Sequence, residues 1–553
     1  MSLSIGILVQ GLQDVSNGQL RIVEEILNNP HIEVVLISSR SSLVVLDKKD
    51  AKHNFFKELF SGISLANGVL RLQIWLEERI FFRKPDSTKK NDIIRLFGKV
   101  QTIKVDCSKQ TGVNFFIQKD IKKIENANLD LIINLRQHPI IEEISTIAKY
   151  GVWDFLFMDV KRNKRGSIGF WEVLNKHEGI GFSLAQLTSN DTKKQIIDTA
   201  FFNRGWSLTE TRNIVHEGAV SVFSKAVRNL VNGRMDFTES DTITIPKYLS
   251  VTLSQVLRYC FGFNLVALQK IGEKLGNVLF SLRPERWSLF LGTGPFMNAV
   301  LSSSEPLEIP SNEFWADSFL FTSKGETYVF FENYSYRTKR GKISCRKIKG
   351  TKLLDIVDVL DLEYHLYFPY IFEENGEIFL MPETSENERL ELYRGVSFPV
   401  KWELYATAFE GETVADAFFY TDEDHEKWLF LNKQVMETAP MNSELYIYNV
   451  DSLKFENLQP HSQNPVIIDA RVARIGGAIF KHAGERYRPS QRNVDAIYGR
   501  ALNINKIEKL SIQEYSERTE RVVRPSFDKN LMTMHHLHQL DGLFIFDAAY
   551  KIK

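Results

Sequence analysis

Cysteine is scarce in this chain of 553 residues, which contains only Cys107, Cys260 and Cys345. Three scattered thiols form no disulfide framework and lack the spacing of a zinc site, so we expect a reducing compartment and no metal. Net charge is absent as well, because 69 Lys and Arg residues balance 69 Asp and Glu residues. Nucleic-acid-binding chains usually carry excess positive charge, so we expect no nucleic-acid partner.

The sequence also lacks a long uninterrupted apolar run. Its start, MSLSIGILVQG, has no basic stretch and too short an apolar segment for a signal peptide, and is typical of a first β-strand. The most apolar stretch, residues 249–279, contains Arg258, Lys270 and Glu273 and is too polar to span a membrane. Weak contact of this stretch with a membrane surface stays open beside helical packing. These absences predict a cytoplasmic location.

Residues 1–240 alternate strand-like and helix-like segments. Short apolar runs of strand length lie at residues 4–9, 33–38, 100–105 and 129–135, and the first two flank a helical pattern. Alternating strands and helices predict an α/β domain with a parallel sheet covered on both faces. Residues 241–285 have mainly helical character and are expected to connect this domain to the next.

An internal repeat begins near residue 286. Its unit is a strand, a turn and a second strand, with glycine at the same place in four of five copies: Gly325, Gly376, Gly484 and Gly542. The copies start at Asp317, Phe368, Asp416, Gly476 and Met534. A repeat of roughly 50 residues built from hairpins is typical of propeller blades. Residues 286–553 are therefore predicted to form an all-β five-bladed propeller, closed by strand 286–291. A β-sandwich would not explain the fixed turn position.

The first domain resembles the methionyl-tRNA and sugar N-formyltransferases, which have a Rossmann-type fold. The resemblance is carried by Gly151-Val-Trp, Arg162-Asn-Lys-Arg-Gly166, Gly169-Phe-Trp-Glu172 and Phe182-Ser-Leu-Ala-Gln-Leu187.

That family moves a formyl group from a folate carrier with an Asn, a His and an Asp. The corresponding positions here are Asp154, Leu156 and Thr192. Leucine exchanges no proton, and a carboxylate repels the oxyanion that the Asn would stabilise. We therefore expect a degenerate domain that binds no folate. Formyl transfer remains an alternative only if this alignment is wrong.

The second domain resembles the five-bladed family that contains glycoside hydrolase family 43. The matching segments are Trp315-Ala-Asp-Ser318, Phe330-Phe-Glu332, Tyr367-Phe-Pro369, Met381-Pro-Glu383 and Phe398-Pro-Val-Lys-Trp402. A closer resemblance is to the propeller segment of plant glucosamine inositolphosphorylceramide transferases. It rests on Pro460-His461, Asn464-Pro465, Asp469, Ala473-Arg474 and Arg488-Pro-Ser-Gln491.

The hydrolase resemblance implies a catalytic set of carboxylates. Asp317 matches the base, Glu383 is the best candidate for the acid, and Asp416 is a candidate modulator. Two carboxyl groups on either side of a sugar can perform acid–base chemistry. His365 and His535 stand near the starts of inner strands and are added as ligand contacts. Alternatively, the aspartates only satisfy local backbone donors.

A cationic set lies in the fourth repeat and just before it. His461, Arg471, Arg474 and Arg488, with Gln491 nearby, would suit phosphate or carboxylate, because guanidinium groups bind such anions in a bidentate way. The alternative is that these arginines pair with local acids such as Asp469 and Asp495.

Three functions follow from these patterns. The first is a transferase of surface-polysaccharide biosynthesis, acting on a glycan or nucleotide-linked sugar with its site in the propeller. The second is a glycoside hydrolase that uses Asp317 and Glu383, and the third is a non-catalytic glycan-binding scaffold. The sequence indicates no certain cofactor, and it identifies neither the sugar, the donor and acceptor, nor the oligomeric state.

Overall fold

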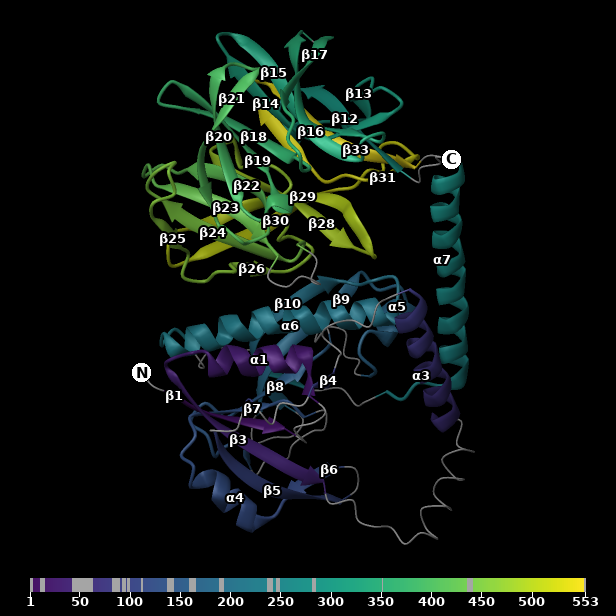
Figure 1. Cartoon of the computed structure of the whole chain (residues 1–553), viewed down its shortest axis with the longest axis vertical. Helices are drawn as coiled ribbons and strands as arrows, with labels where there is room; N and C mark the ends of the chain where they lie inside the picture. The colour runs from purple at the N-terminus through teal and green to yellow at the C-terminus, as the bar shows by residue number, and fades with distance from the viewer. Residues whose placement is uncertain are drawn as a thin grey trace. The chain divides into compact units, whose positions relative to one another are not determined.

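The computed structural model describes residues 3–9, 15–41, 63–81, 90–91, 96, 100–110, 113–136, 144–158, 166–187, 193–235, 242–244, 249–280, 285–350, 352–434 and 441–551. The chain divides into two compact units, Met1–Leu268 and Gln269–Lys553 (Figure 1).

The first unit is built on a nine-stranded mixed sheet. Its centre is parallel, as the sequence predicts, and consists in sheet order of β5 (Gln101–Gln110), β3 (Ile32–Ser41), β1 (Leu3–Val9), β7 (Leu131–Asn134) and β8 (Val152–Leu156). Helices lie on both faces, with α1 (Asn17–Leu27) on one and α4 (Gln118–Glu125) on the other (Figure 1). Ser16 caps α1, since its hydroxyl accepts from the Gln19 amide.

The edges of this sheet are antiparallel, so the expectation of a parallel sheet holds only for its centre. One edge is β6 (Val113–Phe116), and the other is formed by β9 (Gly179–Leu187), β10 (Lys193–Asn203) and β11 (Thr242–Thr244). Short connections such as the one between β9 and β10 permit antiparallel pairing only, because a parallel pair needs a longer crossover.

Among the described residues, four further helices belong to the first unit or lead out of it. They are α3 (Ile63–Ile80), α5 (Phe170–Leu174), α6 (Leu208–Val231) and α7 (Leu253–Phe280). The apolar core around α3 and α7 includes Ala66, Leu70, Val256 and Phe263. No helix among the described residues is long and apolar enough to cross a membrane.

Five antiparallel sheets make up the second unit, which confirms the five-bladed propeller. The first three blades are β14 (Glu313–Ser323) to β17 (Lys352–Leu360), β18 (Tyr367–Glu374) to β21 (Lys401–Ala408), and β22 (Val414–Thr421) to β25 (Leu458–Pro460). Between these ends lie β15 (Glu326–Ser335), β16 (Arg340–Lys349), β19 (Glu377–Glu383), β20 (Leu390–Ser397), β23 (Lys427–Lys433) and β24 (Glu444–Val450), and β26 (Ile467–Ile468) pairs with β24.

The fourth blade contains β27 (Phe480–His482), β28 (Glu485–Val494), β29 (Ile497–Leu510) and β30 (Tyr515–Val523). The fifth blade joins the two ends of the unit. It contains β12 (Glu285–Thr293), β13 (Glu305–Pro306), β31 (Leu531–Thr533), β32 (Leu537–Leu540) and β33 (Leu543–Lys551).

Ring closure follows the prediction for strand 286–291. β12 pairs antiparallel with β33 along its whole length, from Glu285 opposite Lys551 to Thr293 opposite Leu543. The repeated hairpin turns are also confirmed. Gly325 and Gly376 have φ angles of 77° and 78°, and each follows a residue that also has positive φ, as tight hairpin turns of this type require.

Candidate functional site

A β-bulge in the first strand of three consecutive blades positions the site. Strand pairing skips between Ala316 and Phe319 in β14, and equivalent irregularities occur in β18 and β22. At these bulges Asp317, Phe368 and Asp416 have φ angles of 51°, 42° and 53°. A bulge changes the direction in which a side chain points, and strained backbone often occurs at functional sites.

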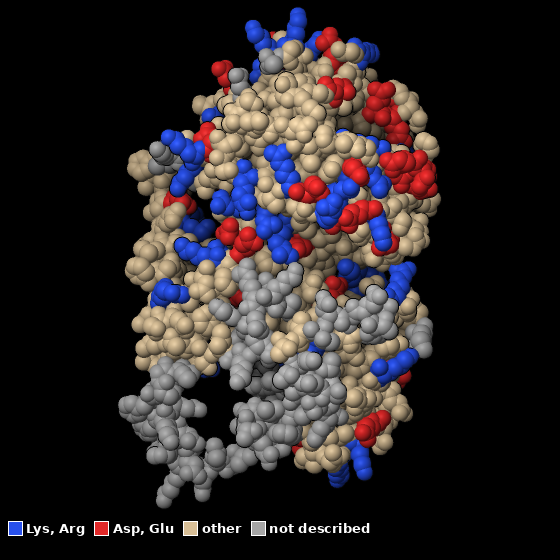
Figure 2. All heavy atoms as spheres, turned by 180° about the vertical axis from the view of Figure 1, so that it is seen from behind, with Lys and Arg blue, Asp and Glu red and all other residues tan. Residues whose placement is uncertain are grey.

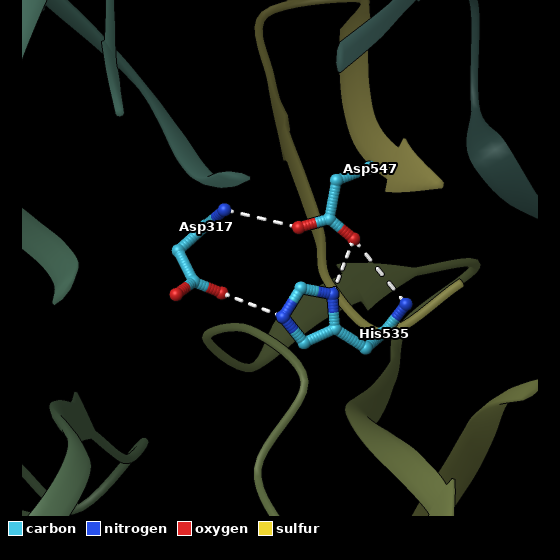
Figure 3. Close-up of side chains that lie close together, drawn as sticks. All are labelled: Asp317, His535 and Asp547. Atoms are coloured by element: carbon cyan, nitrogen blue, oxygen red, sulfur yellow. Dashed lines mark hydrogen bonds and ion pairs between the residues drawn. The ribbon is translucent and has the colours of Figure 1, made fainter. Parts of the chain in front are cut away.

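Asp317 belongs to a buried chain of three residues with His535 and Asp547. Figure 3 shows the imidazole between the two carboxylates. Asp547 Oδ1 lies 2.7 Å from His535 Nδ1, and Asp317 Oδ1 lies 3.3 Å from His535 Nε2. Asp547 also accepts the backbone N–H of Asp317 at 3.0 Å. Although burial disfavours the charged ring, Asp547 and Asp317 raise the pKa of His535 well above its ordinary value. The ring is therefore an imidazolium that holds Asp317 in place.

Glu332 and His365 form a second buried pair. Glu332 Oε1 lies 2.8 Å from His365 Nε2, and Tyr367 stacks on the imidazole with ring centroids 3.7 Å apart. Burial raises the pKa of Glu332 to about 7, with the His365 hydrogen bond opposing the rise and the charge of Asp317 adding to it. Glu332 can therefore hold or release a proton near neutral pH.

The third group consists of Arg474 and the two carboxyl groups that it contacts, Asp416 and Glu383. Arg474 forms ion pairs with Asp416 and, at 3.4 Å, with Glu383, and donates to the Met441 carbonyl at 2.9 Å. Burial raises the pKa of Asp416 well above its ordinary value, and Arg474 offsets this only partly. Glu383 accepts from Ser385 Oγ at 2.7 Å and from the Asp416 amide at 3.3 Å. Its carboxylate is thus largely occupied by protein groups.

These three groups interact electrostatically and form one central cluster. The charge of Asp317 affects both Glu332 and Asp416, and Glu383 also acts on Asp416. The cluster consists of Asp317, Glu332, His365, Glu383, Asp416, Arg474, His535 and Asp547. Its members come from different blades, as expected for a site at the axis of a propeller. Five carboxyl groups outnumber the cationic groups, so the cluster offers mainly hydrogen-bond acceptors and acid–base groups.

Aromatic rings adjoin the cluster. Trp287 and Tyr498 contact the His535 ring, with centroids 4.2 and 5.6 Å away, and Tyr498 is 45% exposed. Partly exposed aromatic faces beside buried polar groups suit recognition of a sugar ring, which has apolar faces and a polar edge.

The other predicted ligand residues lie outside this cluster. Arg471 pairs with Asp469 at 2.5 Å. The Arg488 side chain is fully buried and pairs with Glu517 at 2.6 Å. Both arginines therefore have local carboxylate partners, and Arg474 alone of the predicted arginines belongs to the central cluster.

Gln491 and His461 are also buried. Gln491 donates to the Ile475 carbonyl at 2.9 Å, and the His461 ring accepts the Gln463 amide at 3.1 Å. These contacts lie within the propeller framework, so the structure does not bring the predicted cationic set together.

Sequence reasoning assigned no role to Glu332 or Asp547. Glu332 occupies the same position in its repeat as Glu383 does in the next, and this shared position was the available signal. Asp547 carried no comparable signal, because its relation to Asp317 depends on closure of the ring across 230 residues.

One group of described residues has the composition of a metal site. Ligand atoms of Asp317, His535 and Asp547 lie within 4.8 Å of one another. Both ring nitrogens of His535 already face carboxylates, so the positive charge of the imidazolium already balances Asp317 and Asp547. A divalent cation would have to displace the ring proton, and the absence of a metal stays a prediction.

The predicted formyltransferase positions lie partly within the described residues. Asp154 on β8 forms a buried ion pair with Lys194 and accepts from Asn134 Nδ2 at 3.2 Å. Leu156 is buried among Met158 and Ala185. Thr192 lies outside the described residues.

Comparison with known proteins identifies similarity in the second unit. The family model for glucosamine inositolphosphorylceramide transferase 1, N-terminal, matches residues 270–545. The transferase of that name from Arabidopsis thaliana is 34% identical over 257 residues, covering 45% of this chain and 33% of the relative. The one from Oryza sativa subsp. japonica is 32% identical over 229 residues, with 40% and 30% covered. This chain spans about a third of the length of the curated relatives that it matches.

Solved structures of glycosidases are also similar to this chain. A β-xylosidase/α-arabinofuranosidase from a compost metagenome shares 12% identity at a TM-score of 0.34, covering 43% of this chain and 86% of that one. An endo-arabinase from Bacteroides thetaiotaomicron shares 15% identity at a TM-score of 0.32, covering 45% and 98%.

The expectation of a cytoplasmic location is wrong. The matching relatives are glucosamine inositolphosphorylceramide transferases, which act in the Golgi lumen. The pattern at the start of the sequence and the scarcity of cysteine were therefore insufficient grounds for assigning a compartment.

Proposed function

We propose that this chain is a carbohydrate-active protein of surface-polysaccharide biosynthesis, a transferase whose central cluster binds the sugar part of its substrate. The observation that carries the proposal is the buried set of carboxyl groups at the propeller centre with Trp287 and Tyr498 beside it. The similarity to transferases named for glucosamine and inositolphosphorylceramide supports a role in glycan synthesis.

Acid–base roles can be divided between Asp317 and Glu332. In transfer, the oxygen of an acceptor hydroxyl bonds to the anomeric carbon while the bond to the leaving group breaks. Asp317, held by the His535 imidazolium, accepts the hydroxyl proton. Glu332, whose pKa is about 7, donates a proton to the leaving oxygen. Glu332 replaces Glu383 as acid because Glu383 is engaged by Arg474 and Ser385.

The charge of the cluster favours a neutral or amino sugar over a phosphate. Arg474 is the only arginine in it and already faces two carboxyl groups. An incoming phosphate would meet several carboxylates at close range, and such like-charge contacts are unfavourable in a buried site. The phosphates of a nucleotide-linked sugar would therefore bind outside the cluster.

For the first unit, we infer a formyltransferase-like scaffold without formyl transfer. The support is chemical: Asp154 is neutralised by Lys194, and Leu156 offers no titratable group. No folate is expected to bind.

Glycan-array screening followed by calorimetric titration tests the proposal. Asp317→Asn should weaken binding of a glycan hit at least tenfold, since the neutral amide loses a charge-assisted acceptor. Arg471→Gln is the matched control and should bind as the wild type does. Equal affinity in both variants, or no glycan hit, would contradict the proposal. If incubation of the protein with a bound glycan yields free reducing sugar as the only product, the glycoside hydrolase alternative would be favoured.

A further inference from the structure

Helix α7 has two apolar faces, only one of which is covered. Val256, Tyr259, Phe263 and Ala267 lie on the covered face and pack into the core shared with α3. The second face is exposed over most of the helix, with exposed fractions from 43% at Ile271 to 73% at Val278. Its large apolar side chains are Leu257, Phe261, Leu265, Leu268, Ile271, Leu275, Val278 and Leu279.

The exposed face follows a heptad repeat. Steps of four and three residues alternate through Leu257, Phe261, Asn264, Leu268, Ile271, Leu275 and Val278. This period of 3.5 residues is typical of helices that pair in a coiled coil. The stripe spans 22 residues, or roughly 32 Å of helix. Asn264 is its one polar position, and a single polar residue in such a seam commonly selects register.

We propose that α7 pairs along this stripe with the α7 of a second copy of the chain. Each large apolar side chain carries on the order of 100 Å² of surface. Eight of them, each about half exposed or more, would bury roughly 500 Å² per copy, or about 1,000 Å² in total, near the lower limit for a specific interface.

The alternative partner for this stripe is a membrane surface. The charged residues of α7 favour a membrane less than they favour a second copy of the chain. Helices that lie on membranes are usually rich in Lys and Arg on the polar face. Over its 28 residues α7 has Arg258, Lys270 and Lys274 together with Glu273, and the whole chain has no net charge. On the face drawn in Figure 2 the described basic and acidic side chains are intermingled rather than gathered by sign.

Analytical ultracentrifugation of the full chain tests this pairing. Wild type should sediment as a dimer at micromolar concentration, and the double variant Leu268→Glu, Leu275→Glu should be monomeric. Gln269→Glu with Asn277→Glu adds the same charge to exposed positions off the seam and should remain dimeric. Circular dichroism should be unchanged in both variants, because neither seam residue belongs to the packed core.

Several results would overturn the proposal. These are a monomeric wild type up to about 100 µM, a dimer that persists in the seam variant, or equal dissociation in both variants. Flotation of a monomeric wild type with phosphatidylcholine vesicles, lost in the seam variant, would assign the stripe to a membrane instead.

Discussion

Glu332→Gln should make the propeller less sensitive to rising pH. The substitution keeps the shape of the side chain and a hydrogen-bonding group beside His365 but removes the ionisable carboxyl. In the folded protein the pKa of Glu332 is about 7, against an ordinary value of 4.5. Between these values the unfolded chain releases its proton while the folded protein retains it. Wild-type stability is therefore lost as pH rises from about 4.5 to 7.

The size of the effect follows from this difference in pKa. One pKa unit corresponds to about 1.4 kcal/mol of stability. The rise in the pKa of Glu332 from 4.5 to about 7 therefore lowers the unfolding free energy of the wild type above pH 7 by on the order of 3 kcal/mol. Relative to wild type, Glu332→Gln should gain about 2 kcal/mol between pH 5 and pH 8 by the same relation. Groups such as Asp416 titrate in both proteins, so their contribution largely cancels in the difference.

Urea unfolding of the propeller transition at several pH values measures this difference. Glu403→Gln, which removes a surface carboxylate paired with Arg394, is the control and should differ from wild type by less than about 1 kcal/mol at each pH. Parallel pH profiles for wild type and Glu332→Gln, within about 0.5 kcal/mol, would refute the assignment of Glu332 as a group that titrates near neutrality.

Two further predictions concern the core of the site and the first unit. Arg474→Met leaves Asp416 and Glu383 buried beside one another without a cation, and should destabilise the propeller by about 3–5 kcal/mol in urea unfolding. A loss below about 1 kcal/mol would mean that Arg474 is not the cation that balances this pair. Incubation with formyl-tetrahydrofolate and amino-sugar nucleotides should give no formylated product, because Leu156 cannot exchange a proton; product above background would show that the alignment is wrong.

Local signals in the sequence predicted the propeller well. Glycine at a constant place in the repeats marks hairpin turns, since such turns require positive φ. Strand 286–291 was expected to close the ring, and β12 does so. The antiparallel edges of the first sheet were missed because an apolar run that predicts a strand does not show whether the strand pairs parallel or antiparallel with its neighbour.

The site was harder to predict because its partners are distant in sequence. Asp317, Asp416 and His535 were singled out from their places at strand starts, and they fall in one cluster. The pairing of Arg488 with Glu517 depends on the register between neighbouring strands of the fourth blade, which composition does not reveal. The raised pKa of Glu332 depends on burial, which a repeat position does not specify.

A crystal structure of the protein with a bound glycan would test the proposed sugar site. We expect a sugar ring against Trp287 or Tyr498, with hydroxyl groups within hydrogen-bond distance of Asp317 and Glu332. Its phosphate, if it has one, should lie away from the carboxyl groups. A glycan bound elsewhere on the propeller, with the central cluster unoccupied, would contradict this proposal.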